Sequence, residues 1–141
     1  MKTQLSTFYL GPYFFGLDVK RVQEIIRFHE ISPVPLAPPV ISGLINLRGD
    51  IVTAIDLGLR LEIEEDRVID KEMQMNVVIR TEENSVSLVV DRVGDIIEVE
   101  EGQYEKPPET LKGSAKELIV GTYKLEDRLL LLLDIDKIIQ I

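Results

Sequence analysis

An internal repeat constrains the fold of this chain more than any other feature of its sequence. The segment from Phe15 to Ile26, FGLDVKRVQEII, aligns without a gap with Val86 to Ile97, VSLVVDRVGDII, and six of the twelve positions are identical. Further along, Gly43 to Leu57 aligns with Gly121 to Ile135 and keeps the glycine, a leucine, an aspartate and most apolar positions. Two matches in the same order indicate that the chain contains a duplicated unit.

Each repeat unit consists mainly of short β-strand signals. Runs of β-branched, aromatic and aliphatic residues are separated by turn residues, and the clearest hairpin turns are Gly11-Pro12 and Arg48-Gly49-Asp50. About five short strands per unit is the usual number for a small closed barrel, which removes exposed strand edges. The sequence therefore predicts a mainly β fold of two pseudo-repeated five-stranded β-barrel subdomains. The halves lie approximately at 8–60 and 75–135, within a single domain of residues 1–141.

Helical signals are short and lie at the ends of strands. Asp18 is expected to cap a helical turn over Lys20 to Arg27, because Val19, Val22 and Ile25 or Ile26 recur at helical spacing. Asp134 or Asp136 is expected to cap a short C-terminal helix that ends at Ile141. The segment from Glu98 to Ala115 contains two glycines and two prolines and is expected to be a long loop with one helical turn.

The residues that usually carry catalysis or bind metals are scarce. The chain has no Cys and one His, so disulfides, thiolate zinc sites and cysteine nucleophiles are excluded. No G-x-G-x-x-G, Walker or G-x-S-x-G motif occurs. His29 is better explained as an exposed side chain than as a base oriented by Glu30, because adjacent residues of an extended segment point to opposite faces. The sequence predicts that the protein is not an enzyme and binds no metal or organic cofactor.

Two acidic groups have an ordinary structural explanation. Asp134-Ile-Asp136 is better explained by helix capping than by cation binding, because an apolar, helix-like run follows it directly. The residues Glu62, Glu64, Glu65 and Asp66 lie in the charged connector from Leu61 to Glu72, and such clusters usually form a solvated face. Neither group is expected to form a site.

The charge balance limits the classes of partner. Sixteen Lys and Arg residues against 25 Asp and Glu residues give a net charge of −9, which repels phosphate backbones and anionic lipids. The longest apolar run, Leu129 to Leu133, is too short to cross a bilayer, and the first residues do not resemble a signal peptide. The sequence predicts a cytoplasmic protein that binds no nucleic acid and does not insert into the membrane.

Arg48 is chemically unusual, because it lies in an apolar hairpin that extends from Ile41 to Ile55. A guanidinium group there needs a carboxylate partner or a docked ligand, unless it simply extends from the end of the hairpin into water. Asp50 and Asp56 are near in sequence, and Glu24 lies on the preceding predicted turn. We expect Arg48 to pair with Glu24, because a guanidinium gains most from a bidentate carboxylate.

These motifs resemble the CheW family of chemotaxis coupling proteins. The resemblance rests on V-Q-E-I at 22–25, on I-S-G-L-I-N-L-R-G at 41–49 after a proline-rich stretch, and on I-D-L at 55–57. Leu10-Gly11, F-G-L-D-V at 15–19, V-V-D-R-V at 89–93 and residues 121–133 also resemble the family, so the resemblance covers about residues 7–140. It implies two packed five-stranded SH3-like barrels and a non-enzymatic adaptor. Such an adaptor joins the cytoplasmic tips of chemoreceptors, the methyl-accepting chemotaxis proteins, to the histidine kinase CheA.

The resemblance also implies roles for six residues. Val22 and Gly43 match positions that bind the kinase, through its CheW-like regulatory domain. Glu24, Arg48, Val93 and Ile96 match positions of the receptor-binding or coupling surface. The implied location is the cytoplasm, with recruitment to membrane receptor arrays. For Val22, Val93 and Ile96 a simple core role remains an equal alternative, because apolar periodicity also predicts burial. The alternative function is a small acidic ligand-binding or nucleic-acid-binding β-barrel.

Overall fold

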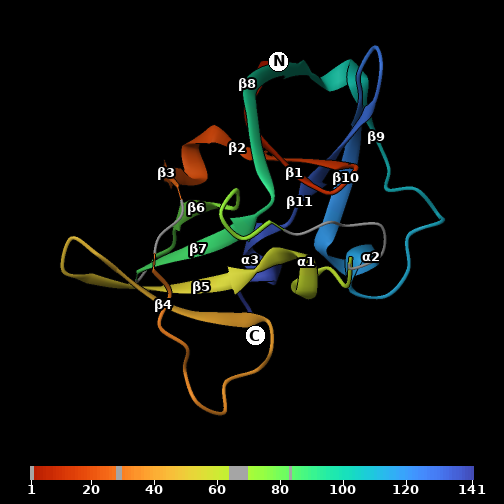
Figure 1. Cartoon of the computed structure of the whole chain (residues 1–141). Helices are drawn as coiled ribbons and strands as arrows, with labels where there is room; N and C mark the ends of the chain where they lie inside the picture. The colour runs from red at the N-terminus through yellow and green to blue at the C-terminus, as the bar shows by residue number, and fades with distance from the viewer. Residues whose placement is uncertain (1, 28–29, 64–69, 83) are drawn as a thin grey trace.

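The computed structural model describes residues 2–27, 30–63, 70–82 and 84–141. One sheet of the described chain has six strands. They are β1 (Lys2–Leu10), β2 (Tyr13–Asp18), β8 (Arg92–Glu100), β9 (Tyr104–Glu105), β10 (Ile119–Lys124) and β11 (Leu129–Leu133). Their order across the sheet is β8-β1-β2-β11-β10-β9 (Figure 1). The two-residue strand β9 makes this sheet one strand larger than the five strands that the repeat predicts.

The second sheet has the five strands that the sequence predicts, as far as the described residues extend. They are β3 (Val22–Ile26), β4 (Ile41–Leu47), β5 (Asp50–Asp56), β6 (Met75–Arg80) and β7 (Ser85–Val90). Their order is β3-β6-β7-β5-β4, so β3 and β4 are the two edge strands. The hairpins β1–β2 and β4–β5 confirm the turns predicted at Gly11-Pro12 and Arg48-Gly49-Asp50. The pairs β6–β7 and β10–β11 form two more hairpins in the described chain.

The repeated segments each contain two strands of different sheets, but they pass between the sheets in opposite directions. Phe15 to Ile26 forms β2, the short 3-10 helix η1 (Val19–Arg21) and β3, and so leads from the six-stranded to the five-stranded sheet. Val86 to Ile97 lies in β7 and β8 and leads back. As a result, the two repeat units exchange strands between the sheets. The parallel pairs β2–β11 and β5–β7 join strands of different repeat units within each sheet. Each sheet therefore combines strands of both repeat units, and the contiguous segments 8–60 and 75–135 do not coincide with the sheets.

The buried side chains form three clusters. One is contributed by the six-stranded sheet alone and includes Leu5, Phe14, Val99 and Leu130. Another is contributed by the five-stranded sheet alone and includes Ile45, Val52 and Val78. The largest contains Phe8, Phe15, Ile55 and Leu88 from both sheets. Residues of the helices α1 (Leu57–Arg60), α2 (Ser114–Leu118) and α3 (Ile135–Ile138) complete this largest cluster. Since neighbouring strand residues point to opposite faces, each sheet has its own core on one face and a shared core on the other.

The predicted helical turn after Asp18 is shorter than expected. Asp18 does cap it, because its carboxylate accepts a hydrogen bond from the Lys20 backbone N–H at 2.9 Å. The turn ends at Arg21, however, and the prediction of helix as far as Arg27 is wrong. The apolar residues Val22, Ile25 and Ile26 instead form β3 and pair with β6, as their β-branched side chains favour.

The C-terminal half shows two further differences of detail. Asp134 caps α3 by accepting from the Lys137 backbone N–H at 3.2 Å, and the helix ends at Ile138. The segment expected to be a long loop from Glu98 to Ala115 begins with the last residues of β8. It then forms the 3-10 helix η2 (Glu101–Gln103), β9 and the start of α2.

Candidate functional site

The position of Arg48 is set by the two-residue turn that joins β4 to β5. Arg48 and Gly49 have φ angles of 52° and 92°, as the central residues of a type I′ hairpin turn require. The side-chain oxygen of Asn46 accepts a hydrogen bond from the Gly49 backbone N–H at 3.0 Å. This turn places the Arg48 side chain at the end of the hairpin, where 67% of it is exposed.

Arg48 forms a bidentate ion pair with Glu24. Its Nη1 donates to Glu24 Oε1 at 3.1 Å, and its Nη2 donates to Glu24 Oε2. Glu24 lies in β3 and only 23% of its side chain is exposed. Asp56, one of the two other carboxylates considered, caps α1 by accepting from the Leu59 backbone N–H at 3.1 Å. The predicted pair is confirmed, and it connects edge strand β3 with the β4–β5 turn.

The ion pair shifts the pKa values of both partners. The hydrogen bond from Arg48 is the largest cause that lowers the pKa of Glu24 below its ordinary value of 4.5, and partial burial opposes this shift. The Gln23 amide also lowers the pKa of Glu24, donating to Oε2 at 3.4 Å. The Gln23 side-chain oxygen in turn accepts from Ser85 Oγ at 2.8 Å. The pKa of Arg48 is raised by its hydrogen bond to Glu24. Both groups are therefore charged at neutral pH.

Val22 and Gly43, the predicted kinase-binding residues, each have a structural role. Val22 is half-buried and packs against the core that the two sheets share. Gly43 has a φ of 149°, and a Cβ atom there would lie 2.3 Å from the Ser32 carbonyl oxygen. The reason is a close approach of the preceding segment, since Ser32 and Leu44 exchange two backbone hydrogen bonds of 2.9 and 2.8 Å. Only glycine fits this position without displacing the backbone.

Val93 and Ile96 lie in β8, an edge strand of the six-stranded sheet. Val93 pairs with Phe8 and packs against the shared core, whereas Ile96 pairs with Ser6 and is 59% exposed. The register between the two pairs shifts at a β-bulge. The core alternative thus fits Val93, and Ile96 is a surface residue. Of the six predicted residues, all of which the structure describes, Glu24 and Arg48 are joined by an ion pair and side-chain hydrogen bonds.

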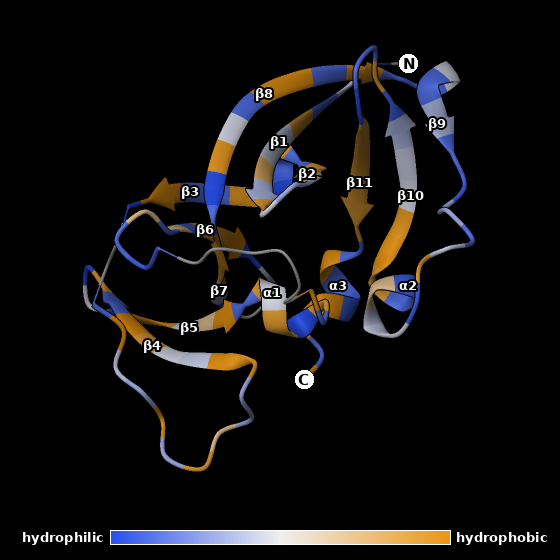
Figure 2. Cartoon of the chain, turned by 45° about the vertical axis from the view of Figure 1, so that its right-hand side comes forward, coloured by the Kyte–Doolittle hydropathy of each residue, from blue (hydrophilic) through white to orange (hydrophobic). Residues whose placement is uncertain are grey.

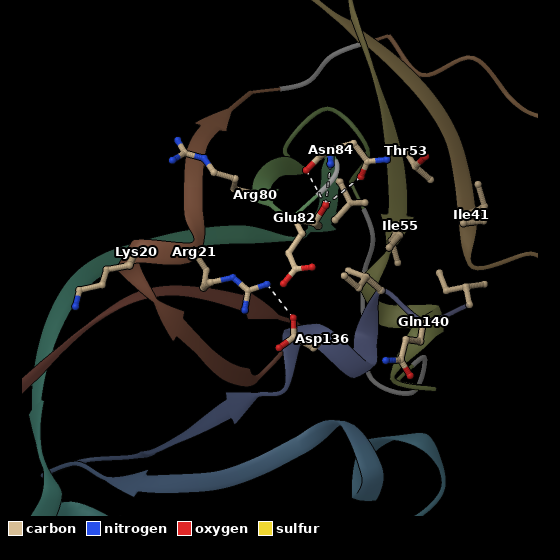
Figure 3. Close-up of a pocket in the computed structure, with 14 residues that line it drawn as sticks. Lys20, Arg21, Ile41, Thr53, Ile55, Arg80, Glu82, Asn84, Asp136 and Gln140 are labelled. Carbon is tan, nitrogen blue, oxygen red and sulfur yellow. Dashed lines mark hydrogen bonds and ion pairs between the residues drawn. The ribbon is translucent and has the colours of Figure 1, made fainter.

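Sequence reasoning missed an open groove of about 930 Å³ (Figure 3). Its apolar lining includes Ile41, Ile55 and Ile139, and an ion pair of 3.0 Å between Arg21 and Asp136 lies at its side. None of the six predicted residues lines this groove. The D-I-D motif, which the sequence assigns to helix capping, contributes Asp136 to this groove, because Asp134 serves as the helix cap and Asp136 pairs with Arg21.

The remaining candidates give no catalytic arrangement in the described part of the chain. His29, Glu64, Glu65 and Asp66 lie outside the described residues. Glu62 accepts a hydrogen bond from the Ser114 hydroxyl group. No group of three or more metal-ligating side chains occurs among the residues that the structure describes. No helix of the described ranges is long and apolar enough to cross a membrane.

Together these features define a duplicated, mainly β protein in which two sheets exchange strands and share a core. A family model described as a CheW-like domain matches residues 4–141, so the chain belongs to the CheW family.

Several named proteins are similar to the chain over nearly its whole length. It is 30% identical to the chemotaxis protein CheW of Treponema pallidum over 137 residues, which are 96% of this chain and 81% of that protein. It is 31% identical to the CheW protein of Thermotoga maritima, covering 97% of this chain and 87% of that one. The crystal structure of the scaffolding protein TtCheW from Thermoanaerobacter tengcongensis matches with a TM-score of 0.88 and 26% identity. That match covers 100% of this chain and 94% of the other.

Proposed function

We propose that this protein is a non-enzymatic adaptor that couples chemoreceptors to the histidine kinase CheA in bacterial chemotaxis signalling. Its membership of the CheW family and its likeness to a structure called a scaffolding protein support a scaffold role. The observation that carries the proposal is the Glu24–Arg48 pair, an exposed bidentate ion pair at family-matched positions. Its exposure makes it available to a partner, and its fixed geometry suits a contact that sets register.

The kinase would bind through Val22 and Gly43, which lie in the two edge strands of the five-stranded sheet, β3 and β4. Strand β3 is an edge strand, so one row of its backbone N–H and C=O groups has no strand partner within the described sheet. Such an edge suits a partner domain of the same fold, because it supplies backbone hydrogen bonds as well as side-chain contacts. The occupant we propose for this edge is the CheW-like regulatory domain of CheA.

The receptor tip would contact the coupling surface formed by Glu24, Arg48, Val93 and Ile96. Ile96 supplies an exposed apolar side chain on edge strand β8, and the ion pair supplies charge on the other sheet. An apolar contact with a few fixed charges fits an amphipathic helical partner. The protein would act in the cytoplasm and be recruited to membrane receptor arrays by these contacts.

A binding experiment with purified components tests this proposal. The protein is immobilised and exposed separately to the host's CheA regulatory domain, to a receptor signalling domain and to single-stranded DNA. We expect saturable binding of the two proteins and none of the DNA. The charge reversal Glu24→Arg should weaken protein binding, and the exposed lysine variant Lys116→Ala should not. Binding of DNA without either protein would favour the acidic ligand-binding or nucleic-acid-binding barrel instead.

A further inference from the structure

Two arginines and two aromatic side chains form a row across the six-stranded sheet. Strands β8, β1 and β2 are consecutive neighbours, followed by β11 (Figure 2), and Tyr9 is the register partner of both Arg92 and Phe14. The guanidinium carbon of Arg92 lies 4.1 Å from the centre of the Tyr9 ring. The rings of Tyr9 and Phe14 are 4.8 Å apart, and the guanidinium carbon of Arg128 lies 3.9 Å from the centre of Phe14. We call these four residues the arginine–aromatic row.

The aromatic members anchor this row in the sheet. Phe14 is buried in the core that belongs to the six-stranded sheet alone, and Tyr9 packs against the same cluster. The arginines remain at the surface: Arg92 is exposed, and 42% of the Arg128 side chain is accessible. Arg128 also donates a hydrogen bond to the Tyr9 hydroxyl oxygen. Both guanidinium groups are therefore held on rigid supports rather than extended freely into water.

Stacking on a ring leaves the binding edge of a guanidinium group available. The contact with the aromatic ring uses the flat face, while the N–H bonds point outward in the plane of the group. Three other arginines of the described chain use these donors internally. Arg48 bonds to Glu24, Arg21 to Asp136, and Arg60 to three backbone carbonyls of the C-terminal segment.

The arginines of the row lack comparable acceptors. Among the described residues, the guanidinium group of Arg92 stacks on the Tyr9 ring and forms no ion pair or hydrogen bond. The carboxylate of Asp127 lies 3.8 Å from Arg128 Nε, but it is 80% exposed and contributes an exposed pair of little strength. Two cations with spare donors thus lie on the surface of a chain whose net charge is −9.

We propose that the arginine–aromatic row is a docking site for an acidic segment of a protein partner. Neighbouring carboxylates of that segment would accept hydrogen bonds from Arg92 and Arg128, in the bidentate geometry that guanidinium groups favour. We infer an acidic partner from the positive charge of the two arginines. Because the net charge of the rest of the chain is negative and repels an acidic segment, such a segment should bind at the arginine–aromatic row. Because Arg92 and Arg128 are already fixed against the aromatic rings, they should lose less conformational entropy on binding than arginines that extend freely into water.

This site is separate from the surface proposed for the adaptor role. Arg92 and Val93 are adjacent in β8 and point to opposite faces of the strand. Val93 packs against the core shared by the sheets, whereas Arg92 stacks on Tyr9, which packs against the other core. The docking site therefore does not depend on whether the chain binds a kinase or a receptor.

A titration of the full chain with a capped hexaglutamate peptide tests the proposal. Backbone amide NMR shifts are followed at low salt, together with the melting temperature of each variant. We expect shifts concentrated at the arginine–aromatic row and an affinity at least about fivefold lower in Arg92→Gln, with a larger loss in Arg92→Gln/Arg128→Gln. Added salt should weaken binding, because the arginines are exposed. The variant Arg92→Lys keeps the positive charge but lacks the planar guanidinium group that can donate two parallel hydrogen bonds. Its affinity should therefore lie between those of the parent protein and Arg92→Gln.

The matched control is Arg80→Gln, which removes an exposed arginine from the other sheet. It should leave peptide binding unchanged, and a capped hexalysine peptide should not bind. An equal loss in Arg80→Gln, or unchanged binding in the double variant, would show non-specific attraction and overturn the proposal. Inorganic phosphate that produces the same shifts at the same concentration would also overturn it, by showing a simple anion site.

Discussion

Arg48 in the β4–β5 turn donates two hydrogen bonds to Glu24 in β3, so one ion pair connects this turn with an edge strand of the five-stranded sheet. The two residues are 24 positions apart in the chain. Strands β3 and β4 are not hydrogen-bonded neighbours in the described sheet. Because no ladder of backbone hydrogen bonds depends on the ion pair, its loss should affect the proposed partner binding more than folding.

Replacing Arg48 should weaken partner binding with little effect on stability. We choose Arg48→Asn, because Asn tolerates the positive φ of 52° that this turn position requires. Since the pair is exposed, the melting temperature should change little. Affinity for the kinase domain, the receptor domain or both should fall by about tenfold, as expected when a register-fixing charge is lost. Calorimetric melting and binding are measured on the same preparation.

The paired control for this experiment is the charge exchange Glu24→Arg/Arg48→Glu. It keeps an ion pair between β3 and the turn but reverses the charges that a partner meets. Folding should be retained while binding stays weak. If Arg48→Asn instead causes a large loss of stability with unchanged affinity, Arg48 belongs to the scaffold and its functional role must be abandoned.

The pKa of Glu24 should respond to the loss of Arg48. In the folded protein this pKa is lowered, chiefly by the hydrogen bond from Arg48. The pair therefore stabilises the fold above the unfolded-state pKa of Glu24, and this contribution disappears as the pH falls through the lower folded-state pKa. A carbon-13 NMR titration of the Glu24 carboxyl group should give a value below 4.5 in the parent protein and a higher one in Arg48→Asn. Identical titration curves would show that the ion pair does not set the pKa of Glu24.

Much of the strand pattern could be predicted from local sequence, but the assignment of strands to sheets could not. Gly11-Pro12 and the turn at Arg48 and Gly49 lie between apolar runs, so both hairpins were predictable. The exchange of strands depends on the parallel pairs β2–β11 and β5–β7. These contacts join distant parts of the chain, and a hydrophobic period of two does not encode which sheet a strand joins.

Strand β3 shows how local pattern can mislead. The spacing of Val19, Val22 and Ile25 fits a helix, but the helical turn stops at Arg21 because pairing with β6 favours an extended backbone. The Glu24–Arg48 pair was predicted correctly nevertheless, since the argument used the chemistry of the guanidinium group rather than the type of element. The arginine–aromatic row was not predicted, because strand register brings its members together from distant positions.

Gly43 should prove necessary for folding as well as for any binding role. A Cβ atom there would lie 2.3 Å from the Ser32 carbonyl oxygen and 2.7 Å from the Ile31 side chain. Gly43→Ala should lower the stability by about 1–3 kcal/mol, because the backbone must shift and its φ is unfavourable. Urea unfolding provides the measurement. Gly102→Ala is the matched control and should change little, since no atom lies within 4 Å of its added Cβ.

Val93 and Ile96 should behave differently, although we proposed both as members of the coupling surface. Val93 packs against the core that the two sheets share, whereas Ile96 is 59% exposed. Val93→Ala should therefore cost about 1 kcal/mol of stability through lost burial and a small cavity. Ile96→Ser should leave the melting temperature nearly unchanged while weakening receptor binding, because only an exposed apolar side chain is lost. Urea unfolding and titration with the receptor signalling domain are compared for both variants. Unchanged receptor affinity in Ile96→Ser would show that Ile96 is not part of the coupling surface. A Val93→Ala variant with unchanged stability and reduced receptor affinity would show that Val93 contacts the receptor directly, which its packing against the core does not suggest.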